Sequence, residues 1–170
     1  MATKAAGRAR TAKKPAPPIK GKASSTKKVA RAVRKPTAKT PMMRKTIDPG
    51  WTWDDGLPLA QARQIGNTIY VSGQVAYNAA GQLVGEGDIK AQTRQVFDNI
   101  KAVLTAAGAG MEDIIKINTY ITDQSKFMEM LAVRKEIFGA NPPASTAVVV
   151  GGLAFPGLLI EVEAIAVKSQ

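Results

Sequence analysis

Two glutamates, Glu161 and Glu163, stand inside an otherwise apolar segment near the end of the sequence, residues 158–167. Side chains of a β-strand alternate between its two faces, so residues two apart point the same way and the two carboxylates should lie side by side. Carboxylates are seldom buried without a partner or a task. Burial and like-charge repulsion both raise the pKa of a carboxyl group, which suits proton transfer near neutral pH. The sequence therefore predicts an acid–base group on this strand.

The composition excludes several other chemistries, because the 170 residues include no histidine and no cysteine. Without cysteine there is no disulfide framework, thiolate nucleophile or thiolate metal site. Without histidine there is no Ser-His-Asp triad, and the commonest transition-metal ligand is missing. No Asp/Asn loop has the spacing of calcium ligands. We therefore expect neither a metal nor a cofactor.

Charge is distributed very unevenly along the chain. Residues 1–50 contain 15 Lys/Arg and one acid, whereas residues 51–170 contain 9 Lys/Arg and 12 acids. The first segment is rich in Lys, Ala and Pro and has too few large apolar residues to offset the entropy of ordering. We therefore predict a disordered basic tail over residues 1–50 and one folded domain over residues 51–170.

Three interpretations of the basic tail stay open. It is a solvated segment that raises solubility, a non-specific binding element for nucleic acid or another polyanion through residues 1–47, or an organelle transit peptide. A composition similar to the tails of linker histones and bacterial nucleoid proteins agrees with the second interpretation, and the excess of Lys over Arg argues against the third. No apolar run reaches the ~20 residues that span a membrane, and no secretory signal follows Met1. We expect a cytoplasmic protein without membrane contact, with organelle targeting as the alternative.

The folded part predicts strands and helices in the order ββαβαββ. The Gly66-Asn67 turn predicts a β-hairpin over residues 58–73. Apolar periodicity and capping residues predict helices over 88–107 and 125–138, and strands over 114–121, 145–150 and 158–167. This order is typical of an α+β sandwich with two helices on one face of a mixed sheet. The other sheet face then needs cover, which an oligomer would supply.

Two of these elements carry side chains with a specific predicted placement. In the strand over 114–121, alternation places Ile115, Ile117, Thr119 and Ile121 on one face. In the helix over 125–138, Arg134 follows the same spacing as the apolar residues Phe127, Met130, Leu131 and Phe138. An arginine in such a stripe either keeps its charged end at the helix edge or serves a binding site.

Four stretches of the folded part together form a family signature. They are LPLAQAR with IYVSGQ (57–63 and 69–74), QTRQVFDNIKAVLTAAG (92–108), DIIKINTYITD (113–123) and PASTAVVV with LLIEVEAIAV (143–167). On these motifs, residues 56–168 resemble the RidA/YjgF family, the reactive-intermediate (enamine/imine) deaminases. The resemblance implies a chorismate-mutase-like ββαβαββ fold. It also implies a homotrimer that binds a small molecule in three clefts between subunits.

The resemblance also assigns roles to individual residues. Glu161 matches the family glutamate that activates or positions water, and Ser72 and Gly73 match a segment that contacts the ligand. Deaminating members carry an arginine that pairs with the substrate carboxylate, a tyrosine in the first strand and an asparagine in the second helix. The corresponding positions here are Ser145, Leu59 and Leu131, so the chain resembles a subgroup without the usual arginine.

The missing arginine leaves alternatives for the ligand site. The hydroxyls of Ser145 and Thr146 are either ordinary strand side chains or hydrogen-bonding groups for a neutral ligand. Arg134 either keeps its charged end in solvent or replaces the arginine as an anion anchor. We interpret Glu163 as a structural carboxylate.

Two functions follow from these observations. The first is cofactor-free hydrolysis of an enamine, an imine or a related reactive intermediate at the subunit interfaces. The alternative is a non-catalytic trimeric protein whose basic tails bind nucleic acid or another polyanion.

Overall fold

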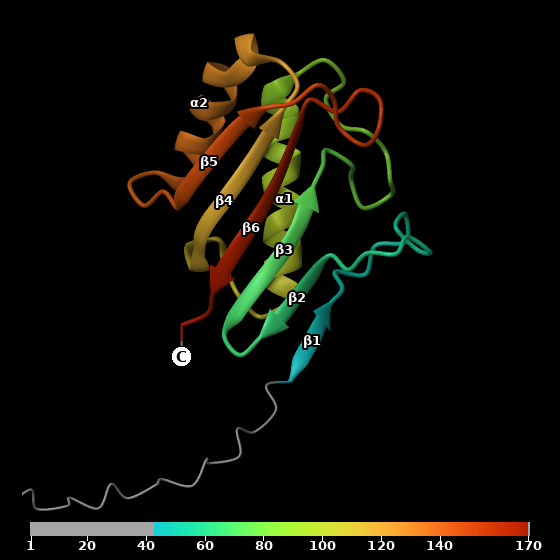
Figure 1. Cartoon of the computed structure of the whole chain (residues 1–170), viewed down its shortest axis with the longest axis vertical. Helices are drawn as coiled ribbons and strands as arrows, with labels where there is room; N and C mark the ends of the chain where they lie inside the picture. The colour runs from blue at the N-terminus through green and yellow to red at the C-terminus, as the bar shows by residue number, and fades with distance from the viewer. Residues whose placement is uncertain (1–42, 170) are drawn as a thin grey trace, which may run out of the picture. The chain divides into compact units, whose positions relative to one another are not determined.

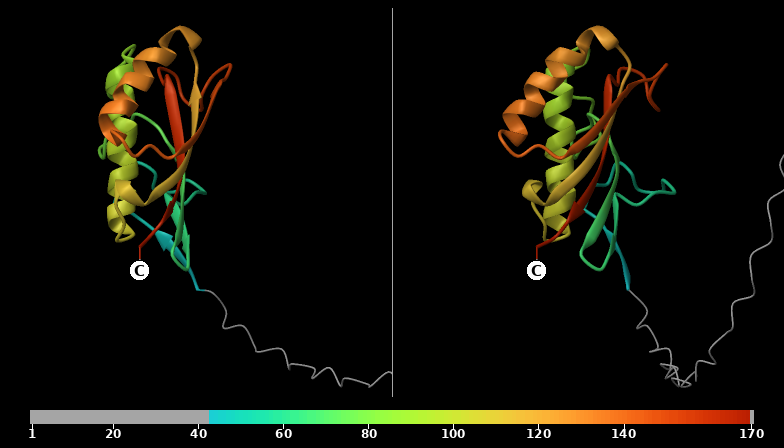
Figure 2. Two further views of the ribbon diagram at one scale, coloured as in Figure 1. Left: turned by 90° about the vertical axis from the view of Figure 1, so that its left-hand side faces the viewer. Right: turned by 60° about the vertical axis from the view of Figure 1, so that its left-hand side comes forward.

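A six-stranded mixed sheet carries two helices on one face in the computed structural model, which describes residues 43–169 (Figures 1 and 2). The strands are β1 (Arg44–Ile47), β2 (Ala62–Ile65), β3 (Thr68–Gln74), β4 (Ile114–Ile121), β5 (Ala144–Val149) and β6 (Ile160–Val167). The helices are α1 (Ile89–Ala106) and α2 (Phe127–Phe138), with short 3-10 turns η1 (Met111–Asp113) and η2 (Gln124–Lys126). The expected α+β architecture, with both helices on one sheet face, is confirmed.

The strand order across the sheet is β1-β2-β3-β6-β4-β5. Among the described strands, β4 and β5 pair in parallel and the other neighbours are antiparallel. The last strand in sequence, β6, therefore lies near the middle of the sheet, between β3 and β4. This places the two glutamates of β6 where side chains from both neighbouring strands can reach them.

β1 lies inside the range predicted as a disordered tail, and its presence differs from the prediction. It pairs with β2 from Arg44 opposite Ile65 to Ile47 opposite Ala62, and Ile47 is buried in the core. Local composition did not reveal this strand, since its order comes from pairing with a segment 18 residues later in the chain. The predictions made for residues 1–42 lie outside the described residues.

The predicted hairpin is present but its first arm is shorter. Gly66 adopts a positive φ of 56° in the turn, as the Gly-Asn signal predicted. The first arm begins at Ala62 instead of Pro58, because Leu57 and Leu59 are exposed and belong to the preceding loop.

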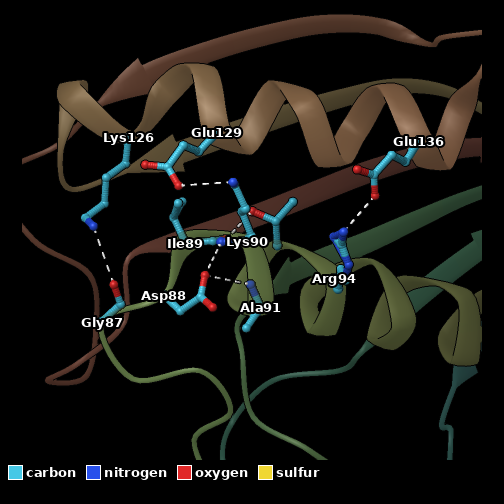
Figure 3. A network of polar contacts seen from close by, with 10 residues as sticks. Gly87, Asp88, Ile89, Lys90, Ala91, Arg94, Lys126, Glu129 and Glu136 are labelled. Atoms are coloured by element: carbon cyan, nitrogen blue, oxygen red, sulfur yellow. Dashed lines mark hydrogen bonds and ion pairs between the residues drawn. The ribbon is translucent and has the colours of Figure 1, made fainter.

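Helix α1 begins where its sequence predicts, at the N-cap residue Asp88. The Asp88 carboxylate accepts hydrogen bonds from the backbone amides of Lys90 and Ala91, at 2.8 and 3.1 Å (Figure 3). The buried side of the helix packs on the sheet, and Phe97 meets Phe138 of α2 edge to face at 5.3 Å between ring centroids. Apolar packing of this kind, rather than capping, holds the helix layer to the sheet.

Two ion pairs also join α1 to α2. Lys90 lies 3.6 Å from Glu129, and Arg94 donates to Glu136 at 2.7 Å (Figure 3). Both pairs are about half exposed, so each stabilises the fold only slightly. These pairs nevertheless occupy both acidic residues of α2, Glu129 and Glu136, on the side of the helix that faces α1.

One predicted side-chain direction is wrong. Ile117, Thr119 and Ile121 of β4 are buried beneath the helices, but Ile115 is 53% exposed. The ladder between β4 and β6 shifts register between Ile114 and Lys116, and this irregularity reverses the alternation at its start. A single sequence gives no signal for such a shift.

The sheet face away from the helices is uncovered in one chain and mixes apolar with polar side chains. Tyr70 of β3 is 50% exposed, and Val148 of β5 and Val167 of β6 are exposed as well. The same face carries Glu161 and Glu163, whose neighbours in β6 alternate between buried and half-buried. No helix within residues 43–169 is both long and apolar enough to cross a membrane.

Candidate functional site

Glu161 lies on the uncovered sheet face, between β3 and β4. In the ladder it pairs with Tyr120 of β4, and on its other side its carboxyl group lies against the backbone of Gly73 in β3. A Cβ atom added to Gly73 would overlap the carboxylate and would lie only 2.8 Å from its Cδ atom. Glycine at position 73 is therefore required for the present position of the Glu161 side chain.

The surroundings of Glu161 favour its protonated form. The residue is half-buried, and its carboxylate accepts no hydrogen bond from any side chain or amide of the described residues. Burial raises the pKa of Glu161 above its ordinary value, and the negative charge of Glu163 adds to this effect. A partly buried carboxyl with a raised pKa and free oxygens is suited to exchange a proton with water or a ligand.

Glu163 differs from Glu161 because neighbouring side chains occupy its carboxylate. Its Oε1 atom accepts hydrogen bonds from Asn118 Nδ2 at 2.6 Å and from the Tyr120 hydroxyl at 3.3 Å. The nearby charge of Glu163 raises the pKa of Tyr120, so the phenol stays a hydrogen-bond donor. These contacts agree with the structural role that the sequence predicted for Glu163.

A second polar contact lies further along the same face. Lys116 of β4 donates from Nζ to the Thr146 hydroxyl of β5 at 2.7 Å. Lys116 also lines a shallow hollow of about 170 Å³ together with Tyr70, Asn118, Glu163 and Ile165. Thr146 therefore shares a sheet face with Glu161, although a lysine already occupies its hydroxyl.

Ser72 and Leu59 lie at the edge of this region. The Ser72 hydroxyl donates to the carbonyl oxygen of Ala60 at 2.6 Å, and the Ser72 amide donates to Gln61 at 3.0 Å. Ser72 thus fastens β3 to the loop before β2. Leu59 is 51% exposed in that loop and lines a hollow with Trp51 and neighbouring loop residues.

Ser145 and Arg134 lie on the other side of the sheet. Ser145 pairs with Ile117, whose side chain is buried under the helices, so successive residues Ser145 and Thr146 face opposite ways. Arg134 belongs to α2, which covers that same face (Figure 2). In one chain, Arg134 and Ser145 are therefore separated from Glu161 by the sheet.

Arg134 is half-buried in an apolar setting. Its Nε atom is shielded from solvent and has no hydrogen-bond partner within residues 43–169. Burial lowers the pKa of Arg134, which nevertheless stays charged at neutral pH. The prediction that Arg134 continues the apolar stripe of the helix agrees with this placement.

The structure thus divides the predicted site residues into two groups. Glu161, Gly73 and Thr146 share the uncovered face, whereas Ser145 and Arg134 lie on the helix side. Ser72 and Leu59 belong to neither group and lie at the edge of the uncovered face, at the loop before β2. Sequence reasoning missed Asn118 and Tyr120, the partners of Glu163. Their spacing of two residues in β4 was the available signal, but the register that brings them to β6 could not be read from the sequence.

Comparison with known proteins gives a consistent result. Residues 57–168 match the model of the family described as endoribonuclease L-PSP. A RutC family protein of Pyrococcus horikoshii is 44% identical over 111 residues, covering 65% of this chain and 87% of that protein. A 2-iminobutanoate/2-iminopropanoate deaminase of Dermatophagoides farinae is 38% identical over 110 residues, covering 65% of this chain and 85% of that protein.

A solved structure extends the likeness to the fold. The crystal structure of the YjgF gene product from E. coli is 35% identical in sequence and superposes with a TM-score of 0.67, covering 74% of this chain and 99% of that chain. The chorismate-mutase-like α+β fold implied by the sequence motifs is therefore confirmed. The matched range begins before β2 and ends after β6, so it includes Glu161 and every other predicted site residue. The chain belongs to the endoribonuclease L-PSP family, the RidA/YjgF proteins.

Proposed function

We propose that the protein hydrolyses small reactive imines or enamines, with Glu161 as its catalytic acid–base residue. The observation that carries this proposal is the Glu161 carboxyl itself, half-buried, with a raised pKa, and lying against Gly73 without a hydrogen-bond donor among the described residues. The name of the Dermatophagoides farinae relative, 2-iminobutanoate/2-iminopropanoate deaminase, supports the same class of reaction.

The reaction needs one water molecule and no redox step. The Glu161 carboxylate takes a proton from water while the water oxygen bonds to the imine carbon. The C=N double bond becomes a single bond, and its nitrogen receives the proton that Glu161 took from water. Glu161 then takes the hydroxyl proton of the resulting amino alcohol and gives it to the nitrogen, so that a C=O bond forms and ammonia leaves.

Backbone amides near Gly73 are the groups that we propose to stabilise the charge that develops during this addition. Because position 73 has no side chain, the Glu161 carboxyl lies directly against the β3 backbone, and we propose that a ligand in contact with Glu161 also lies beside these amides. Ser72 supports this arrangement indirectly, since its hydroxyl and amide hold β3 against the preceding loop. Thr146 and Leu59 are proposed as lining groups for the rest of the ligand.

We further propose that the ligand binds between the subunits of a homotrimer. Support comes from the family motifs and from the placement of the predicted site residues on two faces of one chain, because residues on opposite faces can act together only across an interface. We place the protein in the cytoplasm, with targeting by residues 1–47 as the alternative. Imaging the full chain fused at its C-terminus to a fluorescent protein distinguishes these locations.

The test is the hydrolysis of freshly generated 2-iminobutanoate, followed by the release of ammonia. We expect the wild-type protein to accelerate hydrolysis over buffer, and Glu161→Gln to lower kcat by about 10²–10⁴-fold, because it removes the acid–base group but keeps the side-chain shape. Glu163→Gln is the matched comparison, and we expect it to keep its rate within about tenfold. A wild-type rate equal to that of buffer, or a fully active Glu161→Gln variant, would disprove the proposal.

A second candidate function rests on the charge of the N-terminal segment, which has 15 Lys/Arg and one acid in residues 1–50. Three such segments on one trimer would bind a polyanion with a strong dependence on salt. Retention of the full chain on duplex DNA should then fall steeply between about 50 and 200 mM salt. Equal retention of a variant that lacks residues 1–42 would eliminate this candidate.

A further inference from the structure

Arg134 lies in a hollow of about 220 Å³ on the helix side of the sheet. The hollow is lined by Leu131, Arg134, Lys135, Phe138, Gly139 and Pro142. Its walls are largely apolar, and its charged groups are the two cations. The Nε atom of Arg134 is shielded from solvent without a hydrogen-bond partner in the described part of the chain.

An unpaired buried guanidinium N–H is unfavourable, because its hydrogen bonds to water are lost and not replaced. The acidic residues of α2 do not compensate for it. Glu129 pairs with Lys90 and Glu136 pairs with Arg94, both on the side of α2 that faces α1 (Figure 3). The hollow therefore has excess positive charge and an unused donor, which are the properties of a site for an anion.

The position of the hollow suggests which anion. Leu131 lines it and lies one helical turn before Arg134, so the two side chains share a helix face. Leu131 stands where deaminating relatives have an asparagine. Pro142, which also lines the hollow, lies three residues before Ser145, the position at which those relatives have their carboxylate-binding arginine. Arg134 thus shares a helix face with the first of these positions, and its hollow reaches to within three residues of the second along the chain.

We propose that Arg134 binds the carboxylate of the small-molecule ligand and is the specificity-determining residue for anionic over neutral ligands. This inference rests on the proposed function and deepens it, since it restricts the substrates to imines that carry a carboxylate. A guanidinium suits this task because its planar N–H groups pair with both carboxylate oxygens. Arg134 of one protomer and Glu161 of its neighbour then act on one ligand, since the sheet separates these residues within a chain.

The test measures binding directly and does not depend on turnover. The probes are 2-oxobutanoate, a stable carboxylate that imine hydrolysis would produce, and its methyl ester, which has the same skeleton without the charge. We expect the wild-type full chain to bind 2-oxobutanoate more tightly than the ester in calorimetric titrations. Arg134→Gln should weaken 2-oxobutanoate binding by about tenfold to a hundredfold and leave ester binding unchanged. The affinity of Arg134→Lys for 2-oxobutanoate should lie between the affinities of the wild type and of Arg134→Gln.

Arg94→Gln is the matched control, because it removes the same charge from an exposed ion pair that faces the other helix. We expect it to bind both probes as the wild type does. Circular dichroism and the solution mass of each variant show whether it folds and assembles. Unchanged 2-oxobutanoate binding by a folded Arg134→Gln protein overturns the inference, as does a wild type that does not prefer the acid to the ester. An Arg134→Gln protein that no longer forms a trimer but binds the probes with normal affinity also overturns the inference, since Arg134 would then stabilise a contact between subunits.

The two proposals fail in different ways. If 2-oxobutanoate binds through Arg134 but imine hydrolysis is no faster than in buffer, the catalytic proposal is wrong and the binding site stands. If hydrolysis depends on Glu161 but is equally fast for charged and neutral imines, the assignment of Arg134 is wrong and the catalytic proposal stands.

Discussion

The two glutamates of β6 show how neighbouring residues of one type acquire different properties. They point to the same sheet face, but Asn118 and Tyr120 donate to Glu163, whereas the Glu161 carboxylate faces the bare backbone at Gly73. Donated hydrogen bonds favour an ionised carboxyl, and burial without them favours the neutral form. The charge of Glu163 adds to the effect of burial in raising the pKa of Glu161.

The pH dependence of activity should report this coupling. If Glu161 acts as a base, kcat/KM rises with pH through the raised pKa of Glu161, so the midpoint of the rise should lie above the ordinary carboxyl value of 4.5. Glu163→Gln removes the second cause of the raised pKa, and the midpoint should move to lower pH. A pH profile of kcat/KM for both proteins tests this, and an unmoved midpoint would contradict the coupling.

Stability should depend on pH through the same group. Because the pKa of Glu161 is higher in the folded state, its contribution to stability is complete below the unfolded value and is lost as pH rises through the folded pKa. Glu161→Gln should therefore have a higher Tm than the wild type at pH 7. The difference should vanish below about pH 4, as thermal melts across this range would show.

Gly73→Ala separates function from folding at the residue scale. The φ angle of Gly73 is not in the left-handed region, so the backbone tolerates alanine, but the new methyl group must displace the Glu161 carboxylate. That carboxylate is the end of a flexible side chain and can rotate away at little cost. We expect a Tm within a few degrees of the wild type and a loss of hydrolysis close to that of Glu161→Gln.

Gly152→Ala is the control for this substitution, since a methyl group there meets no atom within 4 Å and the backbone angle is also ordinary. Its activity should equal that of the wild type. A fully active Gly73→Ala protein would show that the position of Glu161 against β3 is not needed for the reaction.

At the scale of elements, sequence patterns predicted what local rules control. The N-cap at Asp88 and the turn at Gly66 are local features, and both appear where expected. The misassigned residues depend on pairing between distant segments. β1 is ordered by β2, and the direction of Ile115 is set by a register shift against β6. The neighbours of Glu163 were missed for the same reason, because a contact across strands is a property of register.

Gln92 shows how a single buried side chain can hold such distant segments together. It is fully buried in α1, where its Nε2 atom donates to the carbonyls of Gly85 at 3.1 Å and Gly157 at 2.8 Å. Its Oε1 atom accepts from the amide of Leu159 at 2.8 Å, directly before β6. The side-chain amide of Gln92 therefore links the loop before α1 to the start of β6, the strand that carries Glu161.

Gln92→Leu keeps the volume but leaves three backbone groups without partners. We expect a loss of about 2–4 kcal/mol in the free energy of unfolding, because each buried unsatisfied group is costly. Urea denaturation measures this loss. Gln95→Leu, in the same helix, removes one side-chain hydrogen bond to Asn99 and should cost about 1 kcal/mol or less. Equal costs for the two variants would show that the bridge made by Gln92 does not matter.

At the scale of the whole molecule, the uncovered sheet face is the feature that most needs a partner. Two helices cover one side of the sheet (Figure 2). The other side exposes Tyr70, Val148 and Val167, together with hydrogen-bonded polar groups. An isolated chain would leave this apolar surface in water. The homotrimer that we propose would cover it and would bring the residues of the two sheet faces together at shared clefts.

Tyr70→Glu tests this assembly. Tyr70 is half exposed in one chain, so a glutamate there should leave the fold intact, but a charge buried in a subunit interface without a partner is strongly unfavourable. We expect the wild type to sediment at three times the chain mass of 18.0 kDa, and the variant to sediment nearer to one chain mass. Met128→Glu, at a 71% exposed position of α2 on the opposite side of the molecule, should leave the trimer unchanged.

Because the proposed clefts lie between subunits, dissociation by Tyr70→Glu should also abolish imine hydrolysis while Glu161 and Gly73 stay in place. A Tyr70→Glu protein that remains a trimer would show that subunits meet through another surface, and an active monomer would show that one chain holds the complete site.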